Sequence, residues 1–131
     1  MTSAKDKIEK FEERRKYPRI TINVPVTLEL PGNRNVEATV YDVSPGGVQI
    51  HCERVVAGIL KAETKGSNTD FDAGFMLKID HKQTEIKARC RLVWIVKMDN
   101  EDYAIGVKFT AVDAHNRQLL KKFIESSMEP Q

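Results

Sequence analysis

The sequence predicts a mainly β protein: a six-stranded antiparallel β-barrel with a C-terminal α-helix and a flexible basic N-terminal arm. Two observations predict the barrel, because stretches of alternating apolar and polar residues recur along the chain and turn-forming residues separate them. A third predicts the helix, since the apolar residues change to a helical spacing near the C-terminus. Short antiparallel strands that form a barrel or a strongly curved sheet, with one helix packed against them, satisfy all three.

The first half of the chain supplies three predicted strands. Alternation is clearest over 20–30, and Pro25 within it indicates a sheet edge or a β-bulge because proline cannot donate to a strand ladder. The sequence PGNRN then predicts a hairpin turn. We expect the second strand at about 36–43 and the third at 48–52, with the turn sequence DVSPGG between them.

The second half is irregular at its start. The segment 53–73 has a short apolar piece before the sequence TKGSNTDFDAG, so we expect a loop with one helical turn. Strand character returns at 75–79, 85–97 and 103–109, with turns at DHKQ and MDNED between them. Asp113 is suited to cap a final helix. The apolar face of that helix consists of Leu119, Leu120, Phe123 and Ile124.

Length and charge suggest one domain with a basic extension. At 131 residues the chain has room for a single core. We divide it into a charged arm at 1–13, a barrel domain with its helix at 14–126 and a tail at 127–131. The net charge is only +2, and the first 22 residues hold seven basic and four acidic side chains. Any attraction for anions is therefore local to the N-terminal end.

Several classes of protein are excluded by the sequence. No apolar run approaches the roughly 20 residues of a membrane span or resembles a signal peptide core, so we expect a cytoplasmic protein. Cys52 and Cys90 stand far apart in apolar stretches, which predicts two buried, reduced thiols rather than a metal site or redox pair. Metal-ligand spacing of histidines is absent, as are a P-loop and G-x-S-x-G, so we expect no cofactor and no enzyme.

A cluster of arginines around Pro18 is the first motif that carries chemistry. Proline is incompatible with a helix interior and favours an extended residue before it, so the cluster is expected to be extended. At about 3.3 Å per residue, Arg15 and Arg19 would emerge on one side roughly 13 Å apart, on the same side as Tyr17. Guanidinium groups suit phosphates and the O6 and N7 edge of guanine. Taken alone, the cluster is more simply a solvated basic run.

The second motif is the sequence DVSPGG, which begins at Asp42. Pro45 and Gly46 fit the central positions of a type II turn, in which Gly46 would have a positive φ. Asp42 and Ser44 would leave the strand on one side, where a carboxylate can accept from N1 and N2 of guanine and a hydroxyl can reach a base or phosphate. Gly47 would let a ligand approach the backbone. Alone, this motif is more simply a tight hairpin stabilised by an Asx-type contact.

Together the two motifs are more specific. An RxxxR motif ends at Arg19 and a DxSxxG motif begins at Asp42, with a predicted hairpin between them. This arrangement resembles the PilZ domain family, bacterial receptors for the second messenger cyclic di-GMP. The stretches ARCRLVWIV and YAIGVKF are also similar to later strands of that family's barrel, so the resemblance covers nearly the whole chain. It implies a PilZ-like barrel and a non-catalytic receptor.

The resemblance also implies roles for single residues. The RxxxR arginines of the family bind guanines and phosphates, and its DxSxxG residues bind a guanine and the ribose-phosphate ring. An arginine directly before RxxxR often accompanies binding of two stacked cyclic di-GMP molecules, so we expect one or two ligands per chain. The implied ligand-binding residues are Arg14, Arg15, Arg19, Asp42, Ser44 and Gly47, with Gly46 and Trp94 as weaker candidates.

Trp94 has two possible positions. It is the only tryptophan and has the same strand parity as Leu92, which favours the core over base stacking. In some PilZ domains, however, a tryptophan at a similar place lies near the ligand.

Two other functions stay open at this point. Barrels with basic arms often bind single-stranded nucleic acid, but the near-neutral body and the lack of interleaved aromatic residues make this less favoured here. A PilZ-like adaptor without ligand binding is the other alternative. In the favoured interpretation, ligand orders the N-terminal arm and changes a surface that an unidentified protein partner contacts.

Overall fold

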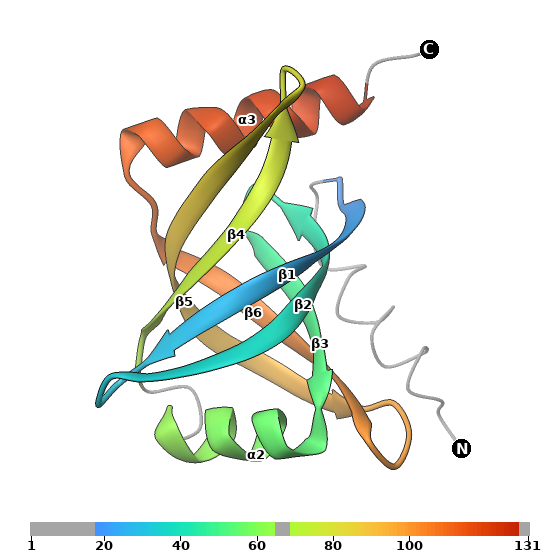
Figure 1. The fold of residues 1–131 in the computed structure, drawn as a ribbon, viewed down its shortest axis with the longest axis vertical. Helices are drawn as coiled ribbons and strands as arrows, with labels where there is room; N and C mark the ends of the chain where they lie inside the picture. Colours follow the sequence, from blue (N-terminus) through green and yellow to red (C-terminus); the bar gives the residue numbers. More distant parts are fainter. Residues whose placement is uncertain (1–17, 65–68, 129–131) are drawn as a thin grey trace.

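The computed structural model describes residues 18–64 and 69–128, and its six strands form a closed antiparallel barrel (Figure 1). The order of strands around the barrel is β1-β2-β3-β6-β5-β4. The strands are β1 (Ile20–Leu30), β2 (Arg34–Ser44), β3 (Gly47–Glu53), β4 (Phe71–Ile79), β5 (Lys82–Lys97) and β6 (Asp102–Ala111). The helices are α2 (Arg54–Glu63) and α3 (Ala114–Met128). The predicted six-stranded barrel with a C-terminal helix is therefore confirmed.

Alternation of side chains along the strands places the apolar residues inside the barrel. In β1, Val26, Leu28 and Leu30 are buried, whereas the residues between them are more exposed. The pairing of β1 with β4, in which Val26 faces Phe75, closes the barrel and completes one continuous core. Closure follows from β1 pairing with β2 on one side and β4 on the other.

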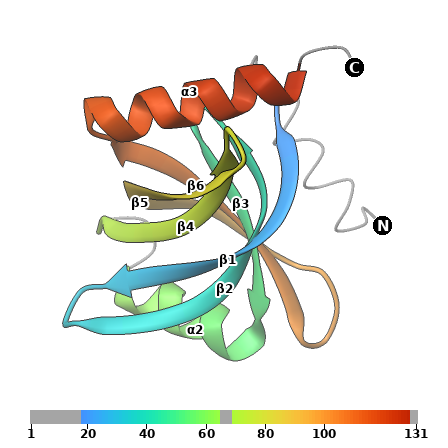
Figure 2. The same ribbon diagram turned by 45° about the horizontal axis from the view of Figure 1, so that its top comes forward.

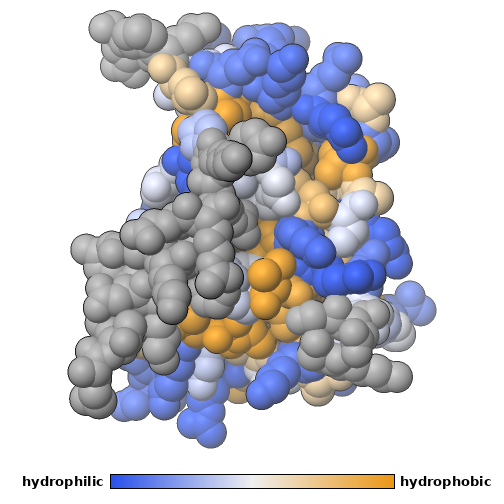
Figure 3. Space-filling model, turned by 180° about the vertical axis from the view of Figure 1, so that it is seen from behind, coloured by the Kyte–Doolittle hydropathy of each residue, from blue (hydrophilic) through white to orange (hydrophobic). Residues whose placement is uncertain are grey.

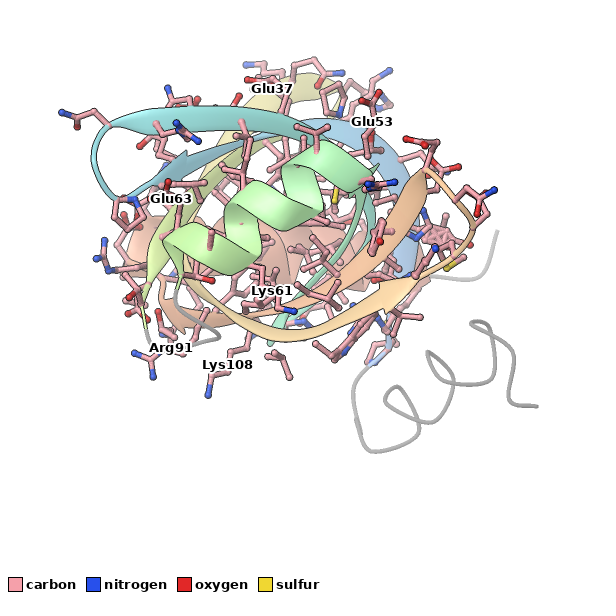
Figure 4. All side chains as sticks on the ribbon, turned by 90° about the horizontal axis from the view of Figure 1, so that it is seen from below. Glu37, Glu53, Lys61, Glu63, Arg91 and Lys108 are labelled. Atoms are coloured by element: carbon pink, nitrogen blue, oxygen red, sulfur yellow. The ribbon has the colours of Figure 1, made fainter. Side chains whose placement is uncertain are left out.

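The two helices cover opposite ends of the barrel (Figures 1 and 2). In the view of Figure 1, α3 crosses the upper end, and α2 lies across the lower opening, as Figure 4 shows from below. Helix α3 begins after Asp113, whose Oδ1 accepts a hydrogen bond of 2.7 Å from the backbone N–H of Asn116. This is the predicted N-cap. Figure 3 shows hydrophobic surface on the back of the molecule, close to α3 and again lower down.

Helix α2 corrects the expectation for the segment 53–73, which we predicted to be a loop with one helical turn. Ala57 and Leu60 face the barrel and are buried, so packing stabilises ten helical residues. Gly58 and the β-branched valines before it have low helix propensity, which hides the helix in the sequence. Strand β4 also begins at Phe71, four residues before the predicted start.

The sequence predicts a sheet edge or a β-bulge at Pro25, and its surroundings agree with both. It faces Thr39 of β2 on one side, but the ladder of β1 with β4 begins only at Val26, so Pro25 has no partner on the other side among the described strands. The pairing of β1 with β2 is irregular between Thr21 and Val24, where Asn23 has a positive φ of 51°. The bulge lies next to the proline and bends the start of the strand.

We predict that Leu60→Ala lowers the free energy of unfolding by about 2–5 kcal/mol, because it leaves a cavity between α2 and the barrel. Urea denaturation followed by far-UV circular dichroism measures the change. Val55→Ala on the same helix is the matched control, since Val55 is 68% exposed, and should change stability by less than about 0.5 kcal/mol. Equal effects of the two substitutions would show that α2 does not pack as described.

Candidate functional site

A bulge in β2 turns Asp42 towards the outside of the barrel. Val40 pairs with Ile50 of β3, but the next pair is Asp42 with Gln49, so Tyr41 is an extra residue on β2. Val40 and Val43 are both in the core, and the two residues between them therefore point outwards. Asp42 is nevertheless only 5% exposed.

The buried carboxylate of Asp42 is paired with Arg19, which joins the two sequence motifs. Nε and Nη2 of Arg19 both donate to Oδ1 of Asp42, at 2.9 and 2.5 Å. The side chains of this pair are 12% and 7% exposed. An ion pair so far removed from water is stronger than a surface pair, and removing one partner leaves a partly buried charge. The pair holds the segment before β1 against the end of β2.

The turn of the second motif is compact, and its backbone differs from our expectation. Gly46 has no positive φ, so the predicted type II turn is wrong, and its carbonyl instead accepts a hydrogen bond from the backbone N–H of Phe109 at 2.9 Å. Ser44 Oγ donates to the carbonyl of Gly47 at 3.3 Å. A Cβ on Gly47 would lie 2.1 Å from the carbonyl oxygen of Val107. Glycine is therefore required at 47 because β6 packs closely against it.

Strand register places Asp42 of the second motif and Trp94 in one row across the outer surface. Neighbouring residues in this row face each other in the register of adjacent strands, in the order β1, β2, β3, β6 and β5. The row consists of Thr21, Asp42, Gln49, Gly106 and Trp94. A carboxylate and an indole thus lie on the same surface, and the absence of a side chain on Gly106 makes room for the indole itself.

Trp94 is buried, at 8% exposure, as a core residue would be, but it does not lie with Leu92 in the main core as its parity predicted. The pairing of β5 with β6 slips between these two residues, so that Leu92 stays in the core and Trp94 lies outside. Its indole covers Gly106, where an added Cβ would come within 2.1 Å of Nε1. Trp94 packs there in a small separate cluster with Val96 and Ala104.

Three residues next to Asp42 were not predicted as part of the site. Gln49 Nε2 lies 3.0 Å from Nε2 of His51, and the His51 ring stacks on Tyr41 with centroids 4.5 Å apart. Within 18–64 and 69–128, the buried Oε1 of Gln49 has no hydrogen-bond partner. The signal in the sequence was the alternation that begins at Gly47 and places every second residue of β3 on the outer surface.

The neighbourhood keeps the His51 ring neutral. Burial lowers the pKa of His51 below its usual value, although the negative charges of Asp42 and Asp102 act in the opposite direction. A neutral ring can accept a hydrogen bond at Nε2 from the amide N–H of Gln49. That arrangement directs the amide oxygen of Gln49 away from the ring.

The structure brings together four of the predicted residues, namely Arg19, Asp42, Ser44 and Gly47, at one end of this row. Gly46 is exposed in the adjacent turn. Trp94 lies at the other end of the row. Arg14 and Arg15 lie outside the described residues.

Nothing in the described part of the chain suggests catalysis through a thiol or a metal. Cys52 and Cys90 are free and buried, as the sequence predicted. Burial raises the pKa of Cys52 to about 11 and that of Cys90 to about 12, so both are protonated thiols near neutral pH. Among the described residues, no three His, Cys, Asp or Glu side chains are grouped to hold a metal ion.

Comparison with known families decides what kind of domain this is. The model of the PilZ domain matches residues 13–126. The chain belongs to the PilZ domain family. PilZ domains are non-catalytic receptors for cyclic di-GMP, in agreement with the expectation that the chain is not an enzyme. No curated protein matches the sequence.

Solved PilZ structures share the fold at low sequence identity. The PilZ domain of YcgR from Escherichia coli with c-di-GMP has a TM-score of 0.62 and 18% identity, over 86% of this chain and 90% of that one. MotI/DgrA, the inhibitor of motility from Bacillus subtilis, has a TM-score of 0.67 and 16% identity, over 88% and 52%. PlzA from Borreliella burgdorferi, in complex with c-di-GMP, has a TM-score of 0.60 and 11% identity, over 94% and 55%. This PilZ chain spans about half the length of the last two proteins.

The described helices of this PilZ domain are too short or too polar to cross a lipid bilayer.

We predict that Gly106→Ala displaces the indole of Trp94 and destabilises the PilZ domain by about 1–3 kcal/mol, because the new methyl group overlaps the ring. Since Trp94 is the only tryptophan, its fluorescence emission reports the displacement directly. Gly74→Ala is the matched control, because it also lies in a strand and no atom lies within 4 Å of the place that its new methyl group would occupy. Unchanged emission in Gly106→Ala would contradict the described packing.

Proposed function

We propose that this PilZ domain is a receptor that binds cyclic di-GMP on the outer surface that carries Arg19 and Asp42. The observation that carries the proposal is the ion pair between these two residues, which joins RxxxR and DxSxxG in one place. A ligand with two phosphates and two guanines needs both a planar cation and an acceptor for guanine N–H groups. The proposed ligand-binding residues are Arg14, Arg15, Arg19, Asp42, Ser44 and Gly47, with Gly46 and Trp94 at lower weight.

The outer row of residues offers a surface for the bases. Asp42 would accept from N1 and N2 of a guanine, while the arginines contact phosphates or stack on a base. The indole of Trp94, which lies over Gly106, gives the row an aromatic end. With Arg14 preceding RxxxR, we propose binding of one or two ligand molecules, the second stacked on the first.

Signal transmission would follow from the same geometry. We propose that ligand orders the N-terminal arm and thereby alters the surface presented to a protein partner, a disorder-to-order switch. The partner is not identified by these residues, and a cytoplasmic location stays a prediction from the sequence.

We predict that Arg19→Ala and Asp42→Ala each weaken binding of cyclic di-GMP by about 10–100-fold, because each removes a charge-assisted hydrogen bond worth about 1.5–3 kcal/mol. Isothermal titration calorimetry gives both affinity and stoichiometry. Either substitution leaves the other member of the ion pair as a partly buried charge without its partner, which can destabilise the fold. Arg15→Ala, which does not remove a member of this pair, is therefore measured too, and circular dichroism checks that each variant is folded.

The control for these arginines is Arg34→Ala, at the opposite end of β2, which should bind as the wild type does. Wild-type affinity in the Arg15, Arg19 and Asp42 variants would overturn the assignment of the site. Affinity that grows with oligonucleotide length and falls steeply with salt would favour a single-stranded nucleic-acid binder instead.

We further predict that Gln49 selects guanine over adenine. Its buried Oε1 has no donor among the described residues, and a buried acceptor in this state is costly unless a partner arrives. Guanine offers N–H donors at N1 and N2, whereas adenine offers an acceptor at N1 and has its donor at N6, on the other side of that acceptor. Gln49→Leu should therefore weaken cyclic di-GMP by about 5–20-fold and leave cyclic di-AMP little changed.

Competition titrations with the two dinucleotides measure this ratio, and Gln83→Leu, an exposed glutamine on β5, is the matched control. An unchanged ratio in Gln49→Leu would remove Gln49 from the site without affecting the assignment of Arg19 and Asp42.

A further inference from the structure

A groove between α2 and β5 lies at the lower end of the barrel, apart from Arg19 and Asp42. Its volume is about 650 Å³, and apolar side chains from α2 and β5, including Ala57, Leu92 and Ile95, line it. Three cations also line it, namely Arg54, Lys61 and Lys97, and no acidic residue does. Lys61 lies on the side of α2 that faces β5, as seen from below (Figure 4). The groove is therefore apolar and positively charged.

Within residues 18–64 and 69–128 the three cations of the groove form no ion pair, although Lys97 is close enough to Asp99 for their charges to interact. Other described basic residues, such as Arg34, Arg91 and Lys122, form ion pairs with nearby acids. Arg54, Lys61 and Lys97 form none with a described residue. Positive charge concentrated in this way attracts an acidic group.

An acidic turn adjoins the groove on the same chain. It joins β5 to β6 and contains Asp99, Glu101 and Asp102, all exposed, with Met98 40% exposed beside them. Oδ1 of Asp99 accepts hydrogen bonds of 3.0 Å from the backbone N–H groups of Glu101 and Asp102, which holds the three carboxylates close together. The negative charge of Asp99 accordingly raises the pKa of Asp102. The turn and the groove are in direct contact, because the backbone N–H of Arg54 donates to the carbonyl of Glu101 at 2.8 Å.

We propose that two copies of this chain associate through this surface, with the acidic turn of each copy seated against the basic groove of the other. A two-fold interface brings the same surface of both copies together, so that surface must be complementary to itself. A positive groove beside a negative turn meets this condition, because rotation by 180° sets each charge against its opposite.

Exposed apolar side chains support the same surface. Five large hydrophobic residues in the described part are exposed, and three of them lie on α2, on β5 or directly after β5: Val55, Val93 and Met98. Figure 3 shows hydrophobic surface among hydrophilic side chains towards this end of the molecule. Apolar surface surrounded by charge is typical of a contact between proteins.

A second copy is favoured over an acidic segment of another protein, because this chain itself carries both the basic groove and the acidic turn that would bind it. Exposed ion pairs contribute little to binding and are screened by salt, so the dimer should be weak and sensitive to salt. Trp94, a lower-weight candidate of the cyclic di-GMP site, also lines the groove, so the association is tested without ligand.

Sedimentation velocity of the full chain, from about 10 μM to about 1 mM and at low and high salt, measures the association. The groove variant is Arg54→Glu with Lys61→Glu, and the turn variant is Glu101→Lys with Asp102→Lys. Each should weaken the dimer by about tenfold or more, because like charges then face each other. An equimolar mixture of the two variants should restore association, since both contacts of the mixed dimer again join opposite charges.

Lys121→Glu on α3 is the control and should associate like the wild type. Circular dichroism checks each fold, and Lys97→Glu replaces the groove variant if that one does not fold. Wild-type chain that stays monomeric at all concentrations overturns the proposal. A dimer that neither charge reversal weakens, or a mixture that associates no better than its components, overturns it as well.

Discussion

Two β-bulges set the direction of the side chains on which the candidate site depends. Along a strand, side chains alternate strictly, so one inserted residue reverses the face of every residue that follows. The insertion of Tyr41 lets Asp42 point outwards while Val43 remains in the core. The insertion before Trp94 moves the indole outwards while Leu92 stays inside. Without these two shifts, the carboxylate and the aromatic ring would lie inside an apolar barrel.

The ion pair of Arg19 and Asp42 then stabilises the carboxylate that the first bulge turns outwards. A carboxylate that is 5% exposed needs a partner, and the arginine comes from just before β1, on the neighbouring strand. The start of β1 and the end of β2 are therefore linked by charge as well as by backbone pairing. A ligand that binds these groups would act on the place where the chain enters the barrel.

Much of this could be predicted from the sequence, because its signals are local. The alternation in β1, the turn residues and the cap at Asp113 depend on neighbouring residues, and each leads to the observed element. Helix α2 could not be predicted, since packing of Leu60 against the barrel outweighs poor helix propensity. The outward position of Trp94 and the proximity of Gln49 to Asp42 depend on register between distant strands, which composition and spacing do not reveal.

Closure of the barrel also limits how another protein can recognise this one. Each of the six described strands has a paired strand on either side, and where both ladders run, no free row of backbone N–H and C=O groups remains. The ladder of β1 with β4 spans only Val26–Glu29, so an extended peptide could pair only with strand ends that extend beyond such ladders. On the doubly paired part of the barrel, a partner must instead read side chains on the curved outer wall, the turns or the helices at either end. Sequence changes at those positions can alter which partner binds while the backbone of the barrel stays the same.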